Sequence, residues 1–164
     1  MSGKLKEKVL SPEIESASIS ARRREVDDPG TQADRFDERI LRALHAANEK
    51  KAAELTVLDL RDIASFTDFF VLASGANKRQ VQAIADEVVE QLKRRGTRAA
   101  RVEGYQNAEW VLVDYGDFIV HVFDHKARRF YDLERLWREA KRFDVTSNQL
   151  ESEISNLRSE VSDL

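Results

Sequence analysis

Hydrophobic and polar positions divide the 164-residue chain into three parts. Residues 1–30 hold few large apolar side chains among mixed charges, so we expect a mobile N-terminal arm that buries too little surface to become ordered. Residues 31–143 carry apolar runs at helical and strand spacing, and we expect the folded domain there. Residues 144–164 carry a heptad pattern and are treated as a separate C-terminal tail.

Three segments of the domain have apolar residues at helical spacing. The first follows Thr31 and Asp34, which form a loose helix-start pattern. The second begins at Lys78, and Gly96 is placed to end it. The third follows Asp132, whose side chain can cap it. The three expected buried faces are Phe36, Ile40, Leu44 and Ala47; Val81, Ile84, Ala85, Val88 and Leu92; and Leu133, Leu136, Trp137 and Ala140.

Five segments fit β-strands. Residues 55–62 alternate, residues 67–75 form a more buried run ended by glycine, and residues 98–104 read as a weak edge strand. Residues 110–125 supply two more strands. The resulting order is helix, strand, strand, helix, strand, strand, strand, helix. This order predicts an α/β fold, with a mixed β-sheet of about five strands flanked by helices.

The stretch WVLVDYGDFIVHVFDH, residues 110–125, is typical of a β-hairpin. A two-residue turn at Tyr115-Gly116 would need a positive φ at Tyr115 and would place Asp114 opposite Asp117. We therefore expect a three-residue Asp-Tyr-Gly loop with Gly116 left-handed. The expected faces are Trp110, Leu112, Phe118, Val120 and Val122 on one side, and Val111, Val113, Asp117, Ile119, His121 and Phe123 on the other.

Both faces of this hairpin are largely apolar, which leaves two interpretations open. In the first, helices cover both faces. In the second, one face is partly bare and meets a protein partner. Trp110 is compatible with either interpretation, because tryptophan is common among interface anchors and also at the buried start of a strand.

The hairpin acids and His121 do not form a promising catalytic set. Asp117 and His121 are four residues apart on one strand, so their Cα atoms lie about 13 Å apart and cannot hold one metal as neighbours. Asp114 and Asp117 can approach each other across the turn, but a solvated tip does not raise a carboxyl pKa for acid–base work. We predict no catalytic residue, metal ligand or cofactor site here.

The Ser74-Gly75 corner faintly resembles the Gly-Ser opening of nucleotidyltransferases. Those enzymes continue with an Asp-x-Asp or Asp-x-Glu pair on a strand. In this chain the next acids, Asp86 and Glu87, are adjacent on a helix, where their side chains diverge by about 100°. The sequence therefore favours a tight strand-to-helix turn over a nucleotide site.

The composition of the chain excludes several further classes of function. The chain has no cysteine and a net charge of −3, which excludes a disulfide framework and a general attraction to nucleic acid. Local basic pairs and runs keep contact with RNA open: Lys78-Arg79, Lys93-Arg94-Arg95 and Arg128-Arg129. No apolar run approaches the roughly 18 residues of a membrane span, and no signal-peptide core precedes the domain. We expect a cytoplasmic protein.

The tail repeats apolar residues at alternating spacings of four and three, with Leu150, Ile154, Leu157, Val161 and Leu164. β-Branched residues at one seam position and leucine at the other favour a parallel dimer. Only two heptads are present, so a tail that packs on its own domain, or an added extension, is the alternative.

Three ordered blocks, SFTDFFVLASGANKRQVQAIADEV, EGYQNAEWVLVDYGDFIVHVF and RRFYDLERLW, resemble the ribosomal silencing factors, also called the Iojap family. The resemblance runs from about Phe36 to Trp137. It implies a nucleotidyltransferase-like shape without the catalytic acids. It also implies binding to the large ribosomal subunit through ribosomal protein L-fourteen, which blocks joining of the small subunit and lowers translation when nutrients are scarce. Members of the family are often dimeric.

The resemblance also makes one block the candidate for partner binding, formed by Trp110, Asp114, Tyr115, Gly116 and Asp117. In this hypothesis Trp110 is a buried anchor and the two aspartates face basic side chains of the ribosomal protein. The expected function is steric and not enzymatic. The alternatives are a nucleotidyltransferase-like or phosphate-handling enzyme, and an RNA-binding protein of the ribosome.

Overall fold

The computed structural model describes residues 36–162, and side chains as far as residue 159. The arm predicted for residues 1–30 lies outside this range. The elements in chain order are α4 (Glu38–Glu49), β1 (Ala53–Asp59), β2 (Phe69–Gly75), α5 (Lys78–Arg94), β3 (Arg101–Glu103), β4 (Trp110–Asp114), β5 (Phe118–Asp124), α6 (His125–Tyr131), α7 (Leu133–Leu136), β6 (Lys141–Asp144) and α8 (Ser147–Ser162).

The strands form one mixed sheet in the order β3-β4-β5-β2-β1-β6. The central pair, β2 and β5, is parallel, and the other neighbours are antiparallel. The predicted α/β class with a mixed sheet is confirmed, with a sixth strand added. The sequence did not indicate β6 because three of its four residues are charged and exposed, so no apolar alternation marks it.

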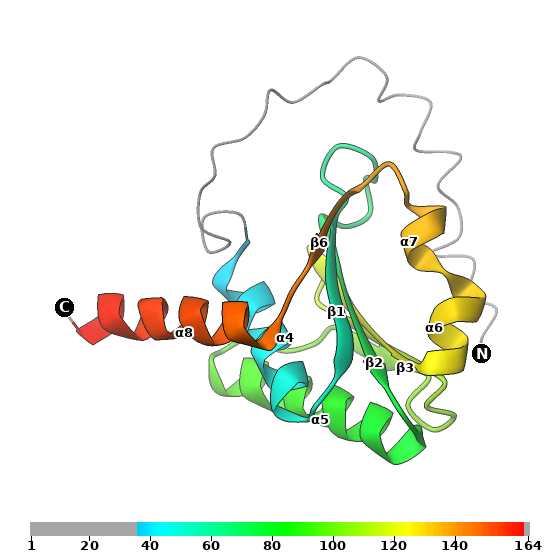
Figure 1. The fold of residues 1–164 in the computed structure, drawn as a ribbon, viewed down its shortest axis with the longest axis horizontal. Helices are drawn as coiled ribbons and strands as arrows, with labels where there is room; N and C mark the ends of the chain where they lie inside the picture. Colours follow the sequence, from blue (N-terminus) through cyan, green and yellow to red (C-terminus); the bar gives the residue numbers. More distant parts are fainter. Residues whose placement is uncertain (1–35, 163–164) are drawn as a thin grey trace.

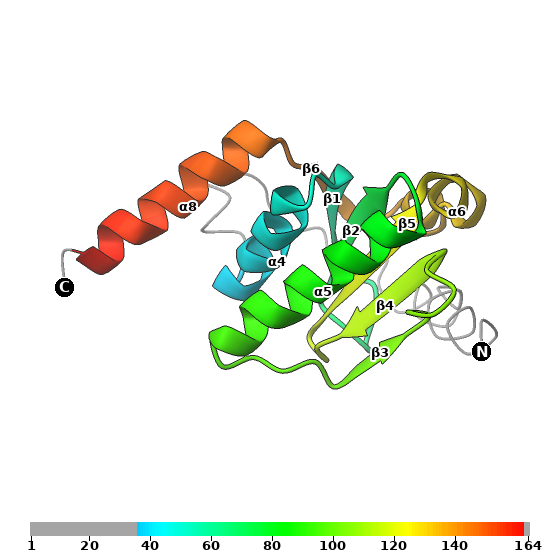
Figure 2. The same cartoon turned by 90° about the horizontal axis from the view of Figure 1, so that it is seen from below.

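Helices cover both faces of the sheet (Figure 1). Helices α4 and α5 lie on one face, α6 and α7 lie on the other, and α8 lies beside α4 (Figure 2). Each face has its own hydrophobic cluster, one containing the buried faces of α4 and α5 and one containing Trp110, Leu133 and Trp137. Of the two interpretations of the hairpin, the one with both faces covered is therefore confirmed.

The two long helices follow the expected chemistry with shifted starts. Helix α4 is capped by Asp37, whose carboxylate accepts a hydrogen bond from the Arg39 amide at 2.9 Å. The predicted start at Thr31 and Asp34 lies outside the described residues. Helix α5 begins after Asn77, whose side chain accepts from the Gln80 amide at 2.8 Å. It ends before Gly96, which has a φ of +89°, as glycine at this position favours.

The prediction that Asp132 caps the last helix is wrong. Asp132 is left-handed, with φ 46° and ψ 60°, and its side chain makes no capping hydrogen bond to α7. It ends α6 instead, because its amide donates to the Arg128 carbonyl at 3.1 Å. Helix α6 was not predicted, since its seven residues bury only Ala127 and Arg128 and show no helical period.

The predicted tail, residues 144–164, starts at the last residue of β6 and consists mostly of α8. Leu150 and Ile154, the first two seam positions, are buried against the chain's own core, and Leu157 is half-buried there. The side chains of Val161 and Leu164 lie outside the described set. Packing of the tail on its own domain is therefore confirmed for the first part of α8, while its distal part extends away from the domain (Figure 2).

Candidate functional site

The hairpin closes through a different turn from the one expected. The Tyr115 amide donates to the Phe118 carbonyl at 3.0 Å, so Gly116 and Asp117 alone form the turn. Gly116 has the predicted positive φ, +88°, but it occupies the first turn position, where glycine fits the strand twist. Asp114 consequently pairs with Ile119 and not with Asp117.

This register changes the two faces of the hairpin. Trp110 lies opposite Phe123, and Leu112 lies opposite His121, so these four side chains share the face covered by α6 and α7. Val111, Val113, Val120 and Val122 share the face covered by α4 and α5. The predicted grouping of Trp110 with Val120 and Val122 is wrong. The observed turn pairs Trp110 with Phe123 and not with Val120, and this shift of three residues exchanges the two faces.

Trp110 lies inside the molecule. Its side chain is largely enclosed, with the residue 6% exposed. Its indole N–H donates to His121 Nδ1 at 3.0 Å, and its ring lies 5.2 Å from Phe123 and 4.6 Å from Tyr131. Because tryptophan can only donate here, the bond needs a neutral His121 with its proton on Nε2. Trp110 thus holds α6 onto the sheet.

Asp114 is also buried, although it was expected to face a partner. One carboxylate oxygen accepts from the Gly116 amide at 2.8 Å, and the other accepts from Arg101 Nε at 3.2 Å. These bonds stabilise the turn and join β4 to the edge strand β3. Its negative charge is therefore matched within the chain.

The hairpin tip exposes only part of the predicted set. Gly116 and Asp117 are exposed, whereas Tyr115 is half-buried with its ring stacked on Phe118 at 4.7 Å. Burial raises the pKa of the Tyr115 hydroxyl, which keeps it neutral. Asp117 accepts from Arg39 Nη1 at 3.3 Å, and a second bond joins its other oxygen to Nη2.

Arg39 links this tip to the start of α4. Its guanidinium also bonds the Asp37 carboxylate, with Nε 3.0 Å from Oδ2. Hydrogen bonds from Arg39 lower the pKa of Asp37 and outweigh the opposing effect of burial. The Arg39 guanidinium therefore binds both Asp37 at the N-cap of α4 and Asp117 in the hairpin turn.

The Ser74-Gly75 corner is closed by neighbouring groups. Ser74 is fully buried, and its hydroxyl accepts from Arg128 Nη1 at 3.0 Å. A Cβ added to Gly75 would lie 2.9 Å from the Val81 side chain, so α5 packs directly on this glycine. Asp86 accepts from the Tyr105 hydroxyl at 3.0 Å. The corner is the tight turn that the sequence favoured.

The described residues offer no assembled metal centre. Among residues 36–162, no three His, Cys, Asp or Glu side chains gather as ligands. His121 is fully buried against the rings of Phe70, Trp110 and Phe123. Its position four residues after Asp117 separates the two Cα atoms by about 13 Å along an extended strand. No described helix is long and apolar enough to span a bilayer.

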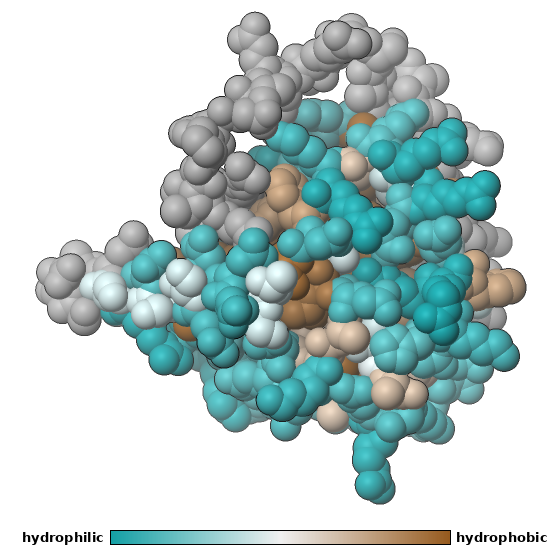
Figure 3. All heavy atoms as spheres, viewed as in Figure 1, coloured by the Kyte–Doolittle hydropathy of each residue, from teal (hydrophilic) through white to brown (hydrophobic). Residues whose placement is uncertain are grey.

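The most exposed large apolar side chain of the described residues lies on α6. Phe130 is 77% exposed, and its ring contacts Tyr131 edge-on at 5.0 Å. Figure 3 shows an apolar group projecting where α6 reaches the edge of the molecule, among hydrophilic neighbours. Tyr131 rests in turn on Trp110. An exposed aromatic pair on a buried support is typical of an interface anchor.

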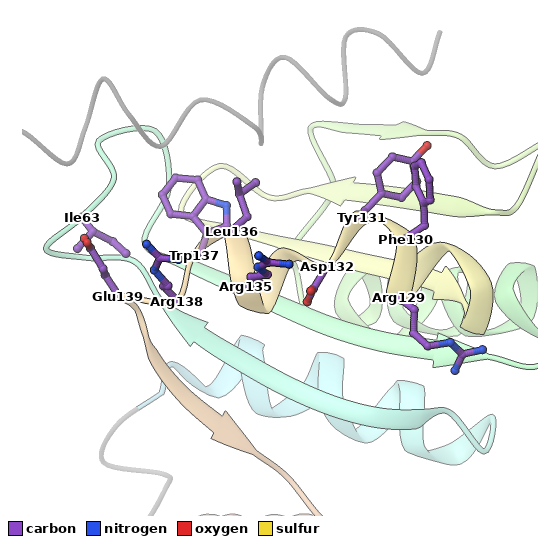
Figure 4. A pocket seen from close by; sticks show the side chains of 10 residues that line it. All are labelled: Ile63, Arg129, Phe130, Tyr131, Asp132, Arg135, Leu136, Trp137, Arg138 and Glu139. Atoms are coloured by element: carbon purple, nitrogen blue, oxygen red, sulfur yellow. The ribbon is translucent and has the colours of Figure 1, made fainter.

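A cavity of about 550 Å³ adjoins this pair along α6 and α7. Figure 4 shows Phe130 and Tyr131 at one end, and Ile63 and Glu139 at the other. Arg129, Arg135 and Arg138 are exposed around it, and none of the three has an ion pair within the described part of the chain. We call Arg129, Phe130, Tyr131, Arg135 and Arg138 the α6–α7 surface.

Sequence reasoning missed this surface. The only available signal was RRFY, residues 128–131, in which two basic residues precede two aromatic ones. Without a predicted helix there, nothing indicated that Arg128 turns inward to Ser74 while Phe130 turns outward.

Comparison with known proteins matches this chain to one family. The model of the family "Ribosomal silencing factor during starvation" matches residues 33–163. A "Ribosomal silencing factor RsfS" from Halalkalibacterium halodurans is 42% identical over 98 residues, covering 60% of this chain and 84% of the relative. The protein of that name from Bacillus subtilis is 40% identical over 103 residues, covering 63% and 87%.

Solved structures and more distant relatives extend this picture. A crystal structure from Bacillus halodurans has a TM-score of 0.59 and 38% identity, covering 66% of this chain and 98% of its own. One from Chromobacterium violaceum has a TM-score of 0.61 and 34% identity, covering 67% and 92%. The mouse protein "Mitochondrial assembly of ribosomal large subunit protein 1" is 29% identical over 108 residues, covering 64% and 47%. With the family model matching most of its length, this chain belongs to the ribosomal silencing factor family.

Proposed function

We propose that this chain binds the large ribosomal subunit and keeps the small subunit from joining it. The observation that carries the proposal is the family match over residues 33–163, since relatives in that family are named as silencing factors of the ribosome. The chain acts by occupying space and not by catalysis. In support of this, Arg128 and α5 fill the Ser74-Gly75 corner, where a nucleotidyltransferase would hold its nucleotide.

The partner in this proposal is ribosomal protein L-fourteen, and the contact is made by the α6–α7 surface. Phe130 inserts as the anchor. Arg129, Arg135 and Arg138, which form no ion pair with the described residues, contact polar or acidic groups of the partner. Tyr131 is half-buried and rests on Trp110, which gives the anchor a rigid base.

The residues predicted from the sequence take different parts here. Trp110 supports the contact from beneath, and Asp114 shapes the hairpin from within. Tyr115, Gly116 and Asp117 lie at the opposite end of β5 from α6, so any contact they make with the subunit is a separate one.

The function is tested by mixing purified protein with separated large and small subunits and measuring full ribosomes on a density gradient. We expect the yield of full ribosomes to fall as protein is added. We also expect the protein to co-sediment with large subunits and not with small subunits. Unchanged joining with the protein at saturation would overturn the proposal.

The contact is tested by Phe130→Ala. Truncating an aromatic anchor costs about 2 kcal/mol of binding free energy, so affinity for large subunits should fall about thirtyfold. The fold should persist, because the ring is exposed. Val102→Ala is the matched control, since Val102 is the other exposed large apolar residue but lies on β3. Equal affinities for both variants would place the contact elsewhere.

A further inference from the structure

Two arginines from separate parts of the chain share one carboxylate, and a third arginine lies near them. Arg42 Nε of α4 lies 4.0 Å from Glu38 Oε1, and Arg95 Nη1, directly after α5, lies 3.7 Å from the same oxygen. Arg158 of α8 is near enough to Arg42 for its positive charge to act on that group. Within the described part of the chain, Glu38 is the carboxylate that pairs with Arg42 and Arg95, and Arg158 adds a third positive charge nearby.

Arg42 is unusual among these arginines because it is buried. The residue is 6% exposed, and its Nε has no hydrogen-bond partner among the residues described. The distance to Glu38 is too long for a hydrogen bond. Burial lowers the pKa of Arg42, and the charges of Arg95 and Arg158 lower it further, against the opposing effect of Glu38. A buried guanidinium with an unused donor gains free energy from an added acceptor.

We propose that Arg42, Arg95 and Arg158 bind a phosphate-type oxyanion at the junction of α4, α5 and α8. A guanidinium offers paired donors in a plane that match the oxygens of a phosphate. A phosphate group carries close to two negative charges near neutral pH, which offsets the positive charge that Glu38 does not balance among the described residues. The shared chemistry fits free phosphate and the phosphodiester groups of RNA alike.

The exposed basic residues nearby do not need such a ligand. Arg94 is paired with Glu90 at 3.1 Å, and Lys93 and Arg94 lie in the last turn of α5, where cations stabilise the helix dipole. The site is distinguished from this surface charge by the buried Arg42 and by contributions from three separate elements.

The site would also hold α8 in place. Arg158 lies one turn beyond the buried Ile154 and next to the half-buried Leu157, in the second half of α8. An anion that bridges Arg158 to Arg42 ties the distal part of α8 to α4. Binding should therefore slow amide exchange there.

The test compares potassium phosphate with potassium chloride at equal ionic strength, using the full chain and no ribosomes. We expect phosphate to raise the thermal midpoint and to slow amide hydrogen exchange at residues 155–162. Arg158→Gln should weaken phosphate binding about tenfold, because it removes a charge-assisted contact. Arg94→Gln, which removes the same charge from an exposed site, should leave the affinity unchanged.

A second pair of variants tests whether the affinity for phosphate can be raised. Glu38→Gln removes the carboxylate that competes with the anion, so the affinity for phosphate should rise severalfold. Glu90→Gln removes a similar charge outside the junction and should have no such effect. A loss of affinity in Glu38→Gln, or equal changes in both variants, would overturn the proposal.

A short single-stranded RNA oligonucleotide distinguishes the two sources of the anion. Binding of inorganic phosphate that depends on Arg158 supports a free anion, while Arg158-dependent binding of the RNA alone supports phosphodiester groups. If neither probe binds in a way that depends on Arg158, the proposal is wrong. Because no ribosome is present, this outcome is independent of the proposed silencing function.

Discussion

The Trp110 indole joins two strands and a helix through one hydrogen bond and several ring contacts. It bonds His121 on the neighbouring strand and supports Tyr131 at the end of α6. Both residues pack against the indole ring, because His121 is fully buried and Tyr131 is half-buried. Changes at Trp110 should therefore act first on folding and only then on partner binding.

We expect Trp110→Ala to lower the free energy of unfolding by about 3–5 kcal/mol, because it leaves a large cavity in a packed cluster. Trp110→Phe keeps most of the packing and loses the bond to His121, so its cost should be nearer about 1–2 kcal/mol. Urea unfolding followed by circular dichroism measures both. A Trp110→Ala variant with the stability of the parent and weakened ribosome binding would instead identify Trp110 as a direct anchor.

The hairpin turn shows where reasoning from single residues reached its limit. The positive φ of Gly116 was predictable, because a tight turn needs one. The register was not, because Gly116 can serve as the last residue of a three-residue loop or the first of a two-residue turn. The structure adopts the second, which lets Asp114 bond the Gly116 amide and Tyr115 stack on Phe118.

The helices and strands that could be predicted from the sequence are those with a regular apolar pattern. Helices α4 and α5 and strands β1, β2, β4 and β5 bury regular apolar patterns, and the sequence indicated all of them. Helix α6 and strand β6 are short and lack a regular apolar pattern, and tertiary contacts such as the pairing of β6 with β1 position them. The α6–α7 surface was missed for the same reason.

Helix α8 yields a test of its packing. Leu150 is fully buried against the α4 side of the core, so Leu150→Ala should lower the free energy of unfolding by about 2–5 kcal/mol. Leu157→Ala should cost less, since Leu157 is only half-buried. Denaturant unfolding at several protein concentrations measures both variants. Equal losses that grow as the protein is diluted would instead support the heptad dimer.

The whole molecule carries little net charge for a protein that we propose binds the ribosome. The sequence has a net charge of −3, and the basic residues of the α6–α7 surface are local. Binding through protein contacts should therefore depend weakly on salt, whereas binding through many RNA phosphates depends steeply on it.

We expect the affinity for large subunits to fall less than about tenfold between about 50 and about 200 mM salt, because few phosphates are contacted. Co-sedimentation across a salt series measures this slope. A loss of about a thousandfold would favour the RNA-binding alternative, in which the protein is held by several phosphates.

The two edges of the sheet are protected in different ways against pairing with other chains. Strand β3 has only three residues, and its Arg101 and Glu103 are charged, so it is a poor template for another chain. Strand β1 is longer and more apolar, and β6 covers its outer edge. By pairing with β1, the segment after α7 protects the protein from edge-to-edge polymerisation, and a chain cut before Lys141 would present a bare strand to its copies.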